Sequence, residues 1–182
     1  MKIYLAGPEV FLPDAEAVFD EKRAICERHN CKGMSPLDNA LDLVNLSKHE
    51  AARAIYNGNE EMMRTCDSII ANVTPFRGIS ADVGTVYEVG FMAALGKPVF
   101  AYSNLTNNYV KRVRSSIYFD TATGLDIAGT EIEDFDLLDN LMIPLGIEQS
   151  GGKFVVHEVA DEEFLYRDLT AFEKAVSLIS ML

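Results

Sequence analysis

Short runs of β-branched and aromatic residues alternate with amphipathic patterns along this 182-residue chain. The short runs predict five strands at 2–6, 31–36, 67–73, 97–102 and 153–156. Helical spacing predicts helices at 13–29, 47–66 and 84–95, a short one at 136–146, and a last one from about 161. This alternation favours one α/β domain, residues 1–182, with right-handed crossovers and a five-stranded, mainly parallel sheet between layers of helices.

Local signals support several of these elements. The run SIIANV has a continuous apolar centre, which is typical of a parallel strand buried on both faces. Ser47 and Glu50 have the spacing of a capping box at the start of a helix, and Gly58 is a point where that helix could bend. An apolar stripe at intervals of four and three predicts a packed C-terminal helix; its members are Leu165, Leu169, Phe172, Val176 and Ile179.

Composition limits the classes of function. A formal net charge of −12 argues against binding long DNA or RNA, because that affinity depends on clustered cations. The one basic cluster, VKRVR at 110–114, is interpreted as a solvated helix face or a subunit contact. No apolar run is long enough to span a membrane, and three cysteines without ligand spacing suggest neither disulfides nor zinc. We therefore expect a soluble cytoplasmic protein without a metal.

In parallel α/β sheets, ligands bind beyond the carboxyl ends of the strands. The loops after the first and third predicted strands contain Gly7, Glu9, Phe11, Arg77 and Asp82. The first of these loops reads AGPEVF, which is not the glycine pattern of a dinucleotide site, and the chain has no Walker A motif. A small neutral ligand without a nucleotide cofactor is the expected partner.

Two acids flank the start of a largely apolar helix in DVGTVYEVGFMAALG, at Asp82 and Glu88. If Gly84 begins that helix, Glu88 lies in about the first turn, where the helix dipole favours a carboxylate. One interpretation is a helix-start acid that faces solvent. The other is a carboxylate nucleophile assisted by a second acid, as in glycosyl transfer with retention, because a charge in an apolar surround is costly to keep for stability alone.

The motifs together resemble the nucleoside 2-deoxyribosyltransferase family. They are IYLAGPEVF (3–11), PLDN (36–39), CDSIIANVTPFRG (66–78), DVGTVYEVGFMAALGKPV (82–99) and DNLM (139–142). The resemblance implies a flavodoxin-like α/β fold. It also implies exchange of the base of a 2′-deoxynucleoside for another purine or pyrimidine, without cofactor or metal.

The resemblance also implies roles for individual residues. Glu88 is similar to a nucleophile that bonds to C1′, and Tyr4 to a tyrosine that holds this carboxylate. Asp82 and Asp67 resemble acids that bind the base and handle its proton. For Tyr4 the alternative is a core tyrosine, and for Asp67 a turn or cap acid at the head of a strand.

The remaining candidates are substrate-binding residues. Phe11 is expected to lie against the base or sugar, in the same loop as Gly7. Asn140 is similar to an asparagine that a neighbouring subunit supplies to the sugar 5′-hydroxyl, which implies a homo-oligomer; alternatively it caps a helix. Asp38 either contacts the ligand or shapes its loop, and Arg77 is a nearby cation that could meet a phosphate. The C-terminal segment departs from the family pattern after residue 145.

Three functional hypotheses follow. The first is a transferase that uses nucleosides and free bases through a deoxyribosyl-Glu88 intermediate, in nucleoside salvage. The second is an N-hydrolase of deoxynucleoside 5′-monophosphates, which needs a phosphate cradle where AGPEVF offers an acid. The third is a non-catalytic nucleoside-binding domain. Base preference, rejection of ribose and oligomer size stay open.

Overall fold

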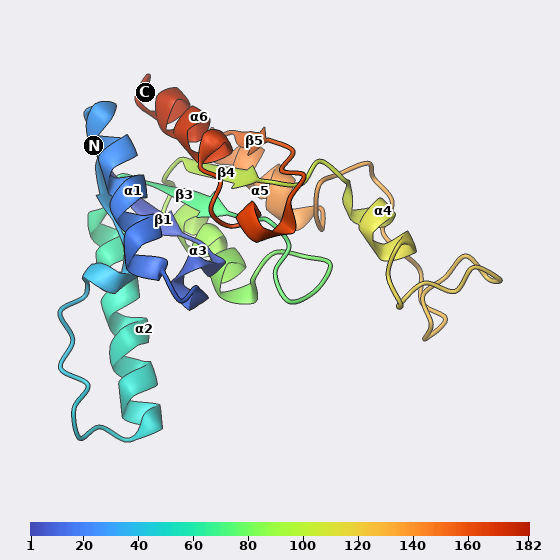
Figure 1. The fold of residues 1–182 in the computed structure, drawn as a ribbon, viewed down its shortest axis with the longest axis horizontal. Helices are drawn as coiled ribbons and strands as arrows, with labels where there is room; N and C mark the ends of the chain where they lie inside the picture. The colour runs from blue at the N-terminus through green and yellow to red at the C-terminus, as the bar shows by residue number, and fades with distance from the viewer.

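A five-stranded, entirely parallel sheet forms the centre of the computed structural model, which describes residues 1–182 (Figure 1). The strand order is β2-β1-β3-β4-β5. The strands are β1 (Lys2–Ala6), β2 (Lys32–Met34), β3 (Ser68–Asn72), β4 (Val99–Ser103) and β5 (Phe154–Val156). Because β1 connects outward to β2 while the next strand returns to pair with β1 on its other side, the order reverses between β1 and β3.

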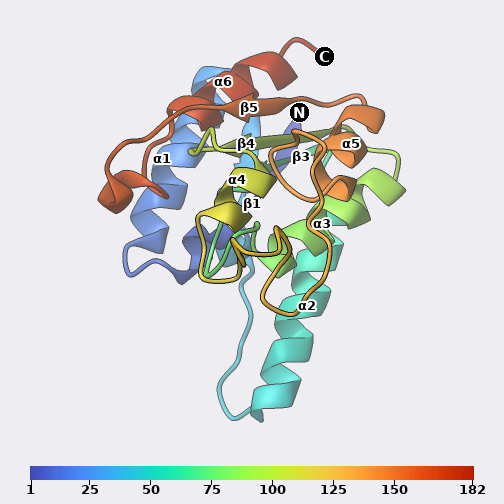
Figure 2. The same ribbon diagram turned by 90° about the vertical axis from the view of Figure 1, so that its right-hand side faces the viewer.

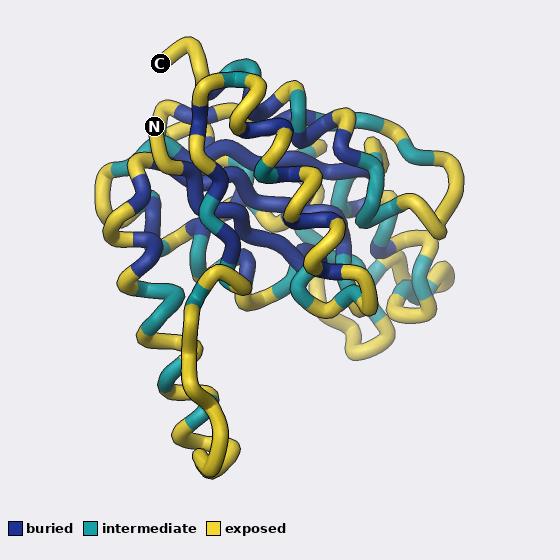
Figure 3. Tube along the Cα trace, turned by 60° about the vertical axis from the view of Figure 1, so that its left-hand side comes forward, coloured by how far each residue is buried: buried dark blue, intermediate teal, exposed yellow.

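Alternate residues of the strands divide the core into two halves. Ile3 and Leu5 of β1 pack on one face, which is covered by α1 (Ala15–Arg28) and α6 (Thr170–Ile179). Tyr4 and Ala6 belong to the other face, which is covered by α2 (Lys48–Thr65), α3 (Val83–Ala94) and α5 (Met142–Gln149). This arrangement confirms the predicted three-layer α/β fold, and the sheet is parallel throughout. The buried parts of the chain run through the middle of the molecule (Figure 3).

Two helix predictions were wrong at their boundaries. The last helix begins at Thr170, not near 161, because the Asn104 amide binds the carbonyl oxygens of Leu165 and Asp168 and holds them in a loop. This loop includes the short 3-10 turn η3 (Glu162–Phe164). The helix predicted at 136–146 begins at Met142 and continues through Gly146 to Gln149.

The start of α5 is delayed by side-chain bonds to the preceding loop. The Asp139 carboxylate accepts from the N–H of Ala81 and from Arg112, so this residue is committed to a distant segment. Glu133 accepts from the Leu141 N–H. Pro144 is the third residue of α5. A proline is tolerated in the first turn because the backbone N–H groups there have no acceptor within the helix.

Two segments extend away from the sheet. The exposed first half of α2 projects from the body beside the loop of residues 39–47 (Figure 2). The predicted capping box at Ser47 and Glu50 is present, and α2 is continuous through Gly58. At the other side of the molecule, α4 (Tyr109–Arg114) is followed by mostly exposed turns over residues 115–141. We call this segment the distal excursion. None of the helices combines the length and apolarity needed to cross a membrane.

Candidate active site

A cavity of about 430 Å³ opens where the order of the sheet reverses, beyond the carboxyl ends of β1, β2 and β3. Its size is within the usual range for a small-molecule site. Turns after strands supply part of the wall, namely η1 (Pro8–Phe11) and η2 (Pro36–Asp38). Helices α2 and α3 and the loop of residues 39–47 supply most of the rest. The lining residues are Gly7, Val10, Phe11, Pro36, Leu37, Asn39, Leu41, Leu43, Ile55, Asn59, Asp82, Gly84, Thr85 and Glu88.

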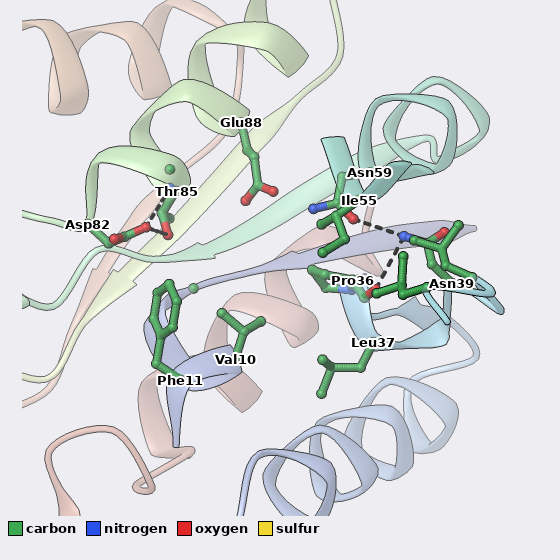
Figure 4. A pocket seen from close by; sticks show the side chains of 14 residues that line it. Val10, Phe11, Pro36, Leu37, Asn39, Ile55, Asn59, Asp82, Thr85 and Glu88 are labelled. Atoms are coloured by element: carbon green, nitrogen blue, oxygen red, sulfur yellow. Dashed lines mark hydrogen bonds between the residues drawn. The ribbon is translucent and has the colours of Figure 1, made fainter. Parts of the chain in front are cut away.

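Glu88 projects from α3 into this cavity (Figure 4). The helix begins at Val83, so Glu88 is its sixth residue and lies in the second turn, not in the first as expected from the sequence. Burial therefore dominates its electrostatics. It raises the pKa of Glu88 to about 7; the hydroxyl of Tyr4 opposes this shift, and the charge of Asp82 adds to it.

Tyr4 holds one oxygen of the Glu88 carboxylate. Its side chain is fully buried in β1, and its hydroxyl donates to Glu88 Oε1 at 2.6 Å. Burial, followed by the adjacent carboxylate, raises the pKa of Tyr4 far above the ordinary range, so the phenol stays protonated and remains a donor. Glu88 Oε2 makes no hydrogen bond within the chain and faces the cavity space.

Asp82 is the N-cap of α3. Its Oδ2 accepts from the backbone N–H of Thr85 at 2.9 Å and from the Thr85 hydroxyl at 3.1 Å. These two bonds fix the carboxyl group at the edge of the cavity, while Oδ1 makes no hydrogen bond within the chain. Asp82 thus has one oxygen free to exchange a proton with a ligand.

An aromatic stack forms the rim next to η1. The rings of Phe11 and Phe76 are stacked with centroids 5.5 Å apart, and Phe76 meets Tyr166 edge-on. The Arg77 guanidinium lies 4.7 Å from the Phe11 centroid and 4.6 Å from that of Phe76. Arg77 does not line the cavity, because these two rings hold its guanidinium outside it.

Several sequence-predicted site residues lie elsewhere. Asp67 precedes β3 and so stands at the amino edge of the sheet, opposite the cavity, where its carboxylate accepts the Lys2 N–H at 2.7 Å. Asp38 binds Arg23 at 2.8 Å and the Ser35 N–H at 2.7 Å, which makes it a loop-forming residue. Neither lines the cavity in this structure, so their contact with a substrate stays a prediction.

Asn140 and Glu9 are also absent from the cavity wall. The Asn140 amide donates to Glu133 at 2.8 Å within the distal excursion. Glu9 is fully buried and points into the core on the other side of η1, where it binds Lys22, Asn72 and Tyr102. The acid that the sequence places in the first loop therefore does not face a ligand.

The structure adds a polar residue that the sequence did not single out, Asn59, and places Asn39 of the PLDN motif beside it in the cavity wall. Asn59 stands one helical turn after Ile55 on α2, so both face the cavity. The spacing of Ile55 and Asn59 is the sequence signal that could have identified Asn59 as a cavity residue. It could not be used without knowing which face of α2 meets the ends of the strands.

A second hollow, of about 350 Å³, lies on the other side of Glu88 between α2 and α3. It shares Asn59, Gly84 and Glu88 with the first cavity. The hydroxyls of Tyr56 and Tyr87 at its edge both bind Glu60, Tyr87 at 3.0 Å.

The cavity combines two carboxylates with an otherwise apolar and amide wall. Asp82 and Glu88 are its only ionisable lining groups, and no histidine, cysteine or third acid stands with them. A carboxylate with one bound and one free oxygen suits attack on carbon, and a second carboxyl group beside it suits proton exchange. Glycosyl transfer through a covalent intermediate uses such a pair of carboxyl groups.

Comparisons with known proteins agree with this geometry. Residues 3–142 match the model of the family described as nucleoside 2-deoxyribosyltransferase. Uncharacterized protein C191.05c of Schizosaccharomyces pombe is 31% identical, over 93% of this chain and 88% of its own length.

Solved structures give the same result. The 2-desoxiribosyltransferase from Leishmania mexicana is similar with a TM-score of 0.63 and 34% identity, over 91% of this chain and 95% of that one. The 2-deoxyribosyltransferase from Bacillus psychrosaccharolyticus shares the fold, with a TM-score of 0.51 and 22% identity over 74% of this chain and 99% of its own. The chain belongs to the nucleoside 2-deoxyribosyltransferase family.

Proposed function

We propose that this protein transfers the 2′-deoxyribosyl group of a 2′-deoxynucleoside from one base to another through a covalent bond to Glu88. The observation that carries the proposal is the Glu88 carboxylate, which faces the cavity with one oxygen held by Tyr4 and the other free. The family to which the chain belongs supports the assignment as a glycosyl-transfer enzyme.

The first step joins the free Glu88 oxygen to C1′ of the sugar. The C1′–N bond breaks, its electron pair leaves on the base, and the base takes up a proton from Asp82 or from solvent. In the second step a ring nitrogen of another base attacks C1′, the C1′–O bond breaks, and its electron pair restores the Glu88 carboxylate. The incoming base gives up its N–H proton to Asp82 or to solvent. Two inversions at C1′ give net retention.

Charge on the cavity wall favours a neutral substrate. The wall contains two acids and no cation, and the guanidinium of Arg77 lies over two aromatic rings outside it. A 5′-phosphate would meet carboxylates without a compensating charge. We therefore propose nucleosides and free bases as the substrates, in preference to nucleoside monophosphates.

Assembly and cellular role belong to the same proposal. Asn140 lies outside the cavity of its own chain, which fits a contribution to the site of a neighbouring subunit in a homo-oligomer. The three cysteines are free and buried, as is usual in a reducing compartment. They support a cytoplasmic location for the proposed role in nucleoside salvage.

Product analysis and intermediate trapping test the proposal. Deoxyadenosine or its monophosphate is incubated with and without free cytosine, and wild-type protein should form deoxycytidine from the nucleoside only. Mass spectrometry after incubation with a 2-fluoro-substituted deoxynucleoside should place a sugar adduct on Glu88. Glu88→Ala should lose both signals and keep the wild-type circular dichroism spectrum.

Other outcomes separate the alternatives. Base release from the monophosphate without transfer to cytosine identifies a hydrolase. Nucleoside binding in calorimetry with no base release over long incubation identifies a non-catalytic domain. Transfer by the Glu88→Ala variant at the wild-type rate rejects Glu88 as the nucleophile.

A further inference from the structure

Asp82 is attached to a loop with few hydrogen bonds of its own. Residues 73–82 join β3 to α3 and contain neither helix nor strand. The one backbone hydrogen bond inside this loop runs from the Phe76 N–H to the Ser80 oxygen, at 3.0 Å. Arg77 has a φ of 54°, a left-handed conformation that is unfavourable for a residue other than glycine. Bonds from other parts of the chain must therefore hold the loop in this form.

A buried ion pair holds the second half of the loop. Arg112 of α4 and Asp139 have side chains only 9% and 2% exposed, and Arg112 Nη2 lies 3.3 Å from Asp139 Oδ2. The same Asp139 oxygen accepts the Ala81 N–H at 3.0 Å, and Arg112 Nε donates to the Ile79 oxygen at 2.7 Å. The pair therefore binds the backbone at two positions just before Asp82.

These two bonds act on the part of the chain that sets the direction of the Asp82 side chain. Ala81 is the residue before the N-cap of α3, and Asp82 turns the chain from the loop into the helix with φ −58° and ψ 132°. A displacement at Ala81 changes these angles and rotates the carboxyl group relative to the cavity. It either breaks the bonds of Oδ2 to Thr85 or turns the free Oδ1 away from a ligand.

The remaining contacts of the ion pair also go to backbone atoms. Asp139 Oδ1 accepts the Asn140 N–H at 2.8 Å, and Arg112 Nη1 donates to the Asn107 oxygen. Two buried charges are expensive to desolvate, and an apolar pair of similar size often gives equal or higher stability. The geometry that this pair imposes on the loop explains its presence better than stability does.

We propose that Asp139 and Arg112 are positioning residues for proton exchange by Asp82. This inference rests on the proposed function. Neither residue lines the cavity, so the pair acts only by keeping Asp82 Oδ1 directed at the base. As the C1′–N bond breaks, the protonated Asp82 carboxyl group gives its proton to the leaving base, which keeps the electron pair of that bond. The incoming base returns a proton to the same carboxylate in the second step.

Asp139→Asn tests the hold on the loop. The Asp139 carboxylate accepts from three donors, whereas an amide of the same size presents an NH2 group to at least one of them. The loop then loses an anchor, and kcat for transfer from deoxyadenosine to cytosine should fall about tenfold. Asp134→Asn makes the same change in the exposed Asp134–Arg114 pair of the distal excursion and should leave kcat unaltered.

A double-mutant cycle shows whether the pair acts through Asp82. Asp82→Asn removes the proton donor and should lower kcat about 100-fold. Because Asp139 only orients this group, Asp139→Asn in the Asp82→Asn background should cause no further loss. A general structural effect would multiply instead and would make the double variant about 1,000-fold slower than wild type.

Arg112→Lys provides a second variant that keeps both charges of the pair. The ammonium group can meet Asp139, but it lacks the planar fork that also reaches the backbone oxygens of Ile79 and Asn107. This change should lower kcat about fivefold and should again add nothing to Asp82→Asn. It replaces Asp139→Asn in the cycle if the loss of charge prevents folding. All proteins are compared well below their unfolding temperatures.

Hydrogen exchange reports on the position of Asp82 without any reaction. The Ala81 N–H is bonded to Asp139, and both residues are buried. The N–H of Thr85, which is also buried, is bonded to the Asp82 carboxylate. Asp139→Asn should speed exchange at both amides about tenfold more than at Ile70 of β3, which reports on the whole fold. Such a result supports the positioning of Asp82 even if wild-type protein transfers no sugar.

Two results overturn the inference. One is transfer by wild-type protein together with unchanged kcat in Asp139→Asn and Arg112→Lys, or with a double variant slowed by the product of the single losses. This result leaves the proposed reaction standing. The other is unchanged exchange at Ala81 and Thr85 in Asp139→Asn, which decides against the inference whether or not wild-type protein transfers the sugar.

Discussion

The Tyr4 hydroxyl acts on Glu88 in two ways. Its bond to Oε1 fixes the orientation of the carboxylate, and it favours the ionised form that can attack carbon. Burial works against ionisation and is the larger effect, because the pKa of Glu88 is about 7. The proposed nucleophile is therefore half ionised near neutral pH, and the rate of the proposed sugar transfer should rise with pH through this value.

Tyr4→Phe should move this dependence to higher pH. A hydrogen bond to a charged group contributes about 1.5 to 3 kcal/mol, so its loss should raise the pKa of Glu88 by about one to two units. Activity at pH 7 should fall about 5- to 50-fold and recover in part at pH 9. The pH profile of kcat/KM checks this, with the exposed Tyr118→Phe as control; a profile in the wild-type position would contradict it.

Among individual site residues, the sequence predicted those that share one local motif. Asp82 and Glu88 belong to the same helix start, so their proximity needed no knowledge of the fold. Asp67 lies away from the cavity because it precedes its strand, and only the strand direction shows that it is at the amino edge. Asn59 was missed because contacts between α2 and the ends of the strands are not encoded in local spacing.

Among the elements, η1 and α1 are joined by a buried ion pair. Lys22 of α1 and Glu9 of η1 are both fully buried, and the Lys22 ammonium lies 5.1 to 5.5 Å from the ring centroids of Phe19, Tyr102 and Phe172. Asn72 and Tyr102 donate to the same Glu9 oxygen, at 2.9 and 2.7 Å. The turn that carries Phe11 is thereby tied to the ends of β3 and β4.

Removing one partner of this pair should be costly. Lys22→Met leaves an unpaired buried carboxylate and should lower the free energy of unfolding by about 3 to 5 kcal/mol. Adding Glu9→Gln should recover most of the loss. Urea denaturation of both variants, with the exposed Lys174→Met as control, measures the effect; wild-type stability of the single variant would show that the pair is not essential.

The elements themselves were largely predictable where sequence patterns are local. The apolar runs predicted β1, β3 and β4 to within two residues, and the capping box predicted the start of α2. The starts of α5 and α6 were not predictable, because Asp139 and Asn104 bind partners far along the chain. An apolar stripe reports which residues are buried, but it does not show whether a distant amide keeps the first of them out of a helix.

For the whole molecule, the cavity imposes a cost on stability. The pKa of Glu88 is about 7 in the folded chain, above the ordinary value of 4.5 for a glutamate, so folding disfavours the charged form. The folded state carries no such cost below pH 4.5, loses stability as pH rises from 4.5 to 7, and stays at the lower level above 7. The shift corresponds to about 3 kcal/mol.

Glu88→Gln should therefore stabilise the protein in a pH-dependent way. Glutamine keeps an oxygen for the Tyr4 hydroxyl and cannot ionise. The variant should unfold at higher temperature than wild type at pH 8 and at nearly the same temperature at pH 4.5. Calorimetric scans at both pH values measure this, and an equal shift at both would contradict the assigned cost of ionisation.

The position of α6 in the chain has a consequence for synthesis. Every residue of the cavity wall lies between 7 and 88, whereas α6, which covers Ile3, Leu5 and Phe100 together with α1, begins only at Thr170. While the chain grows on the ribosome, only α1 covers this half of the sheet until α6 has been made. A nascent chain that stalls after β4 would expose an apolar sheet surface, which chaperones bind and on which other chains can aggregate.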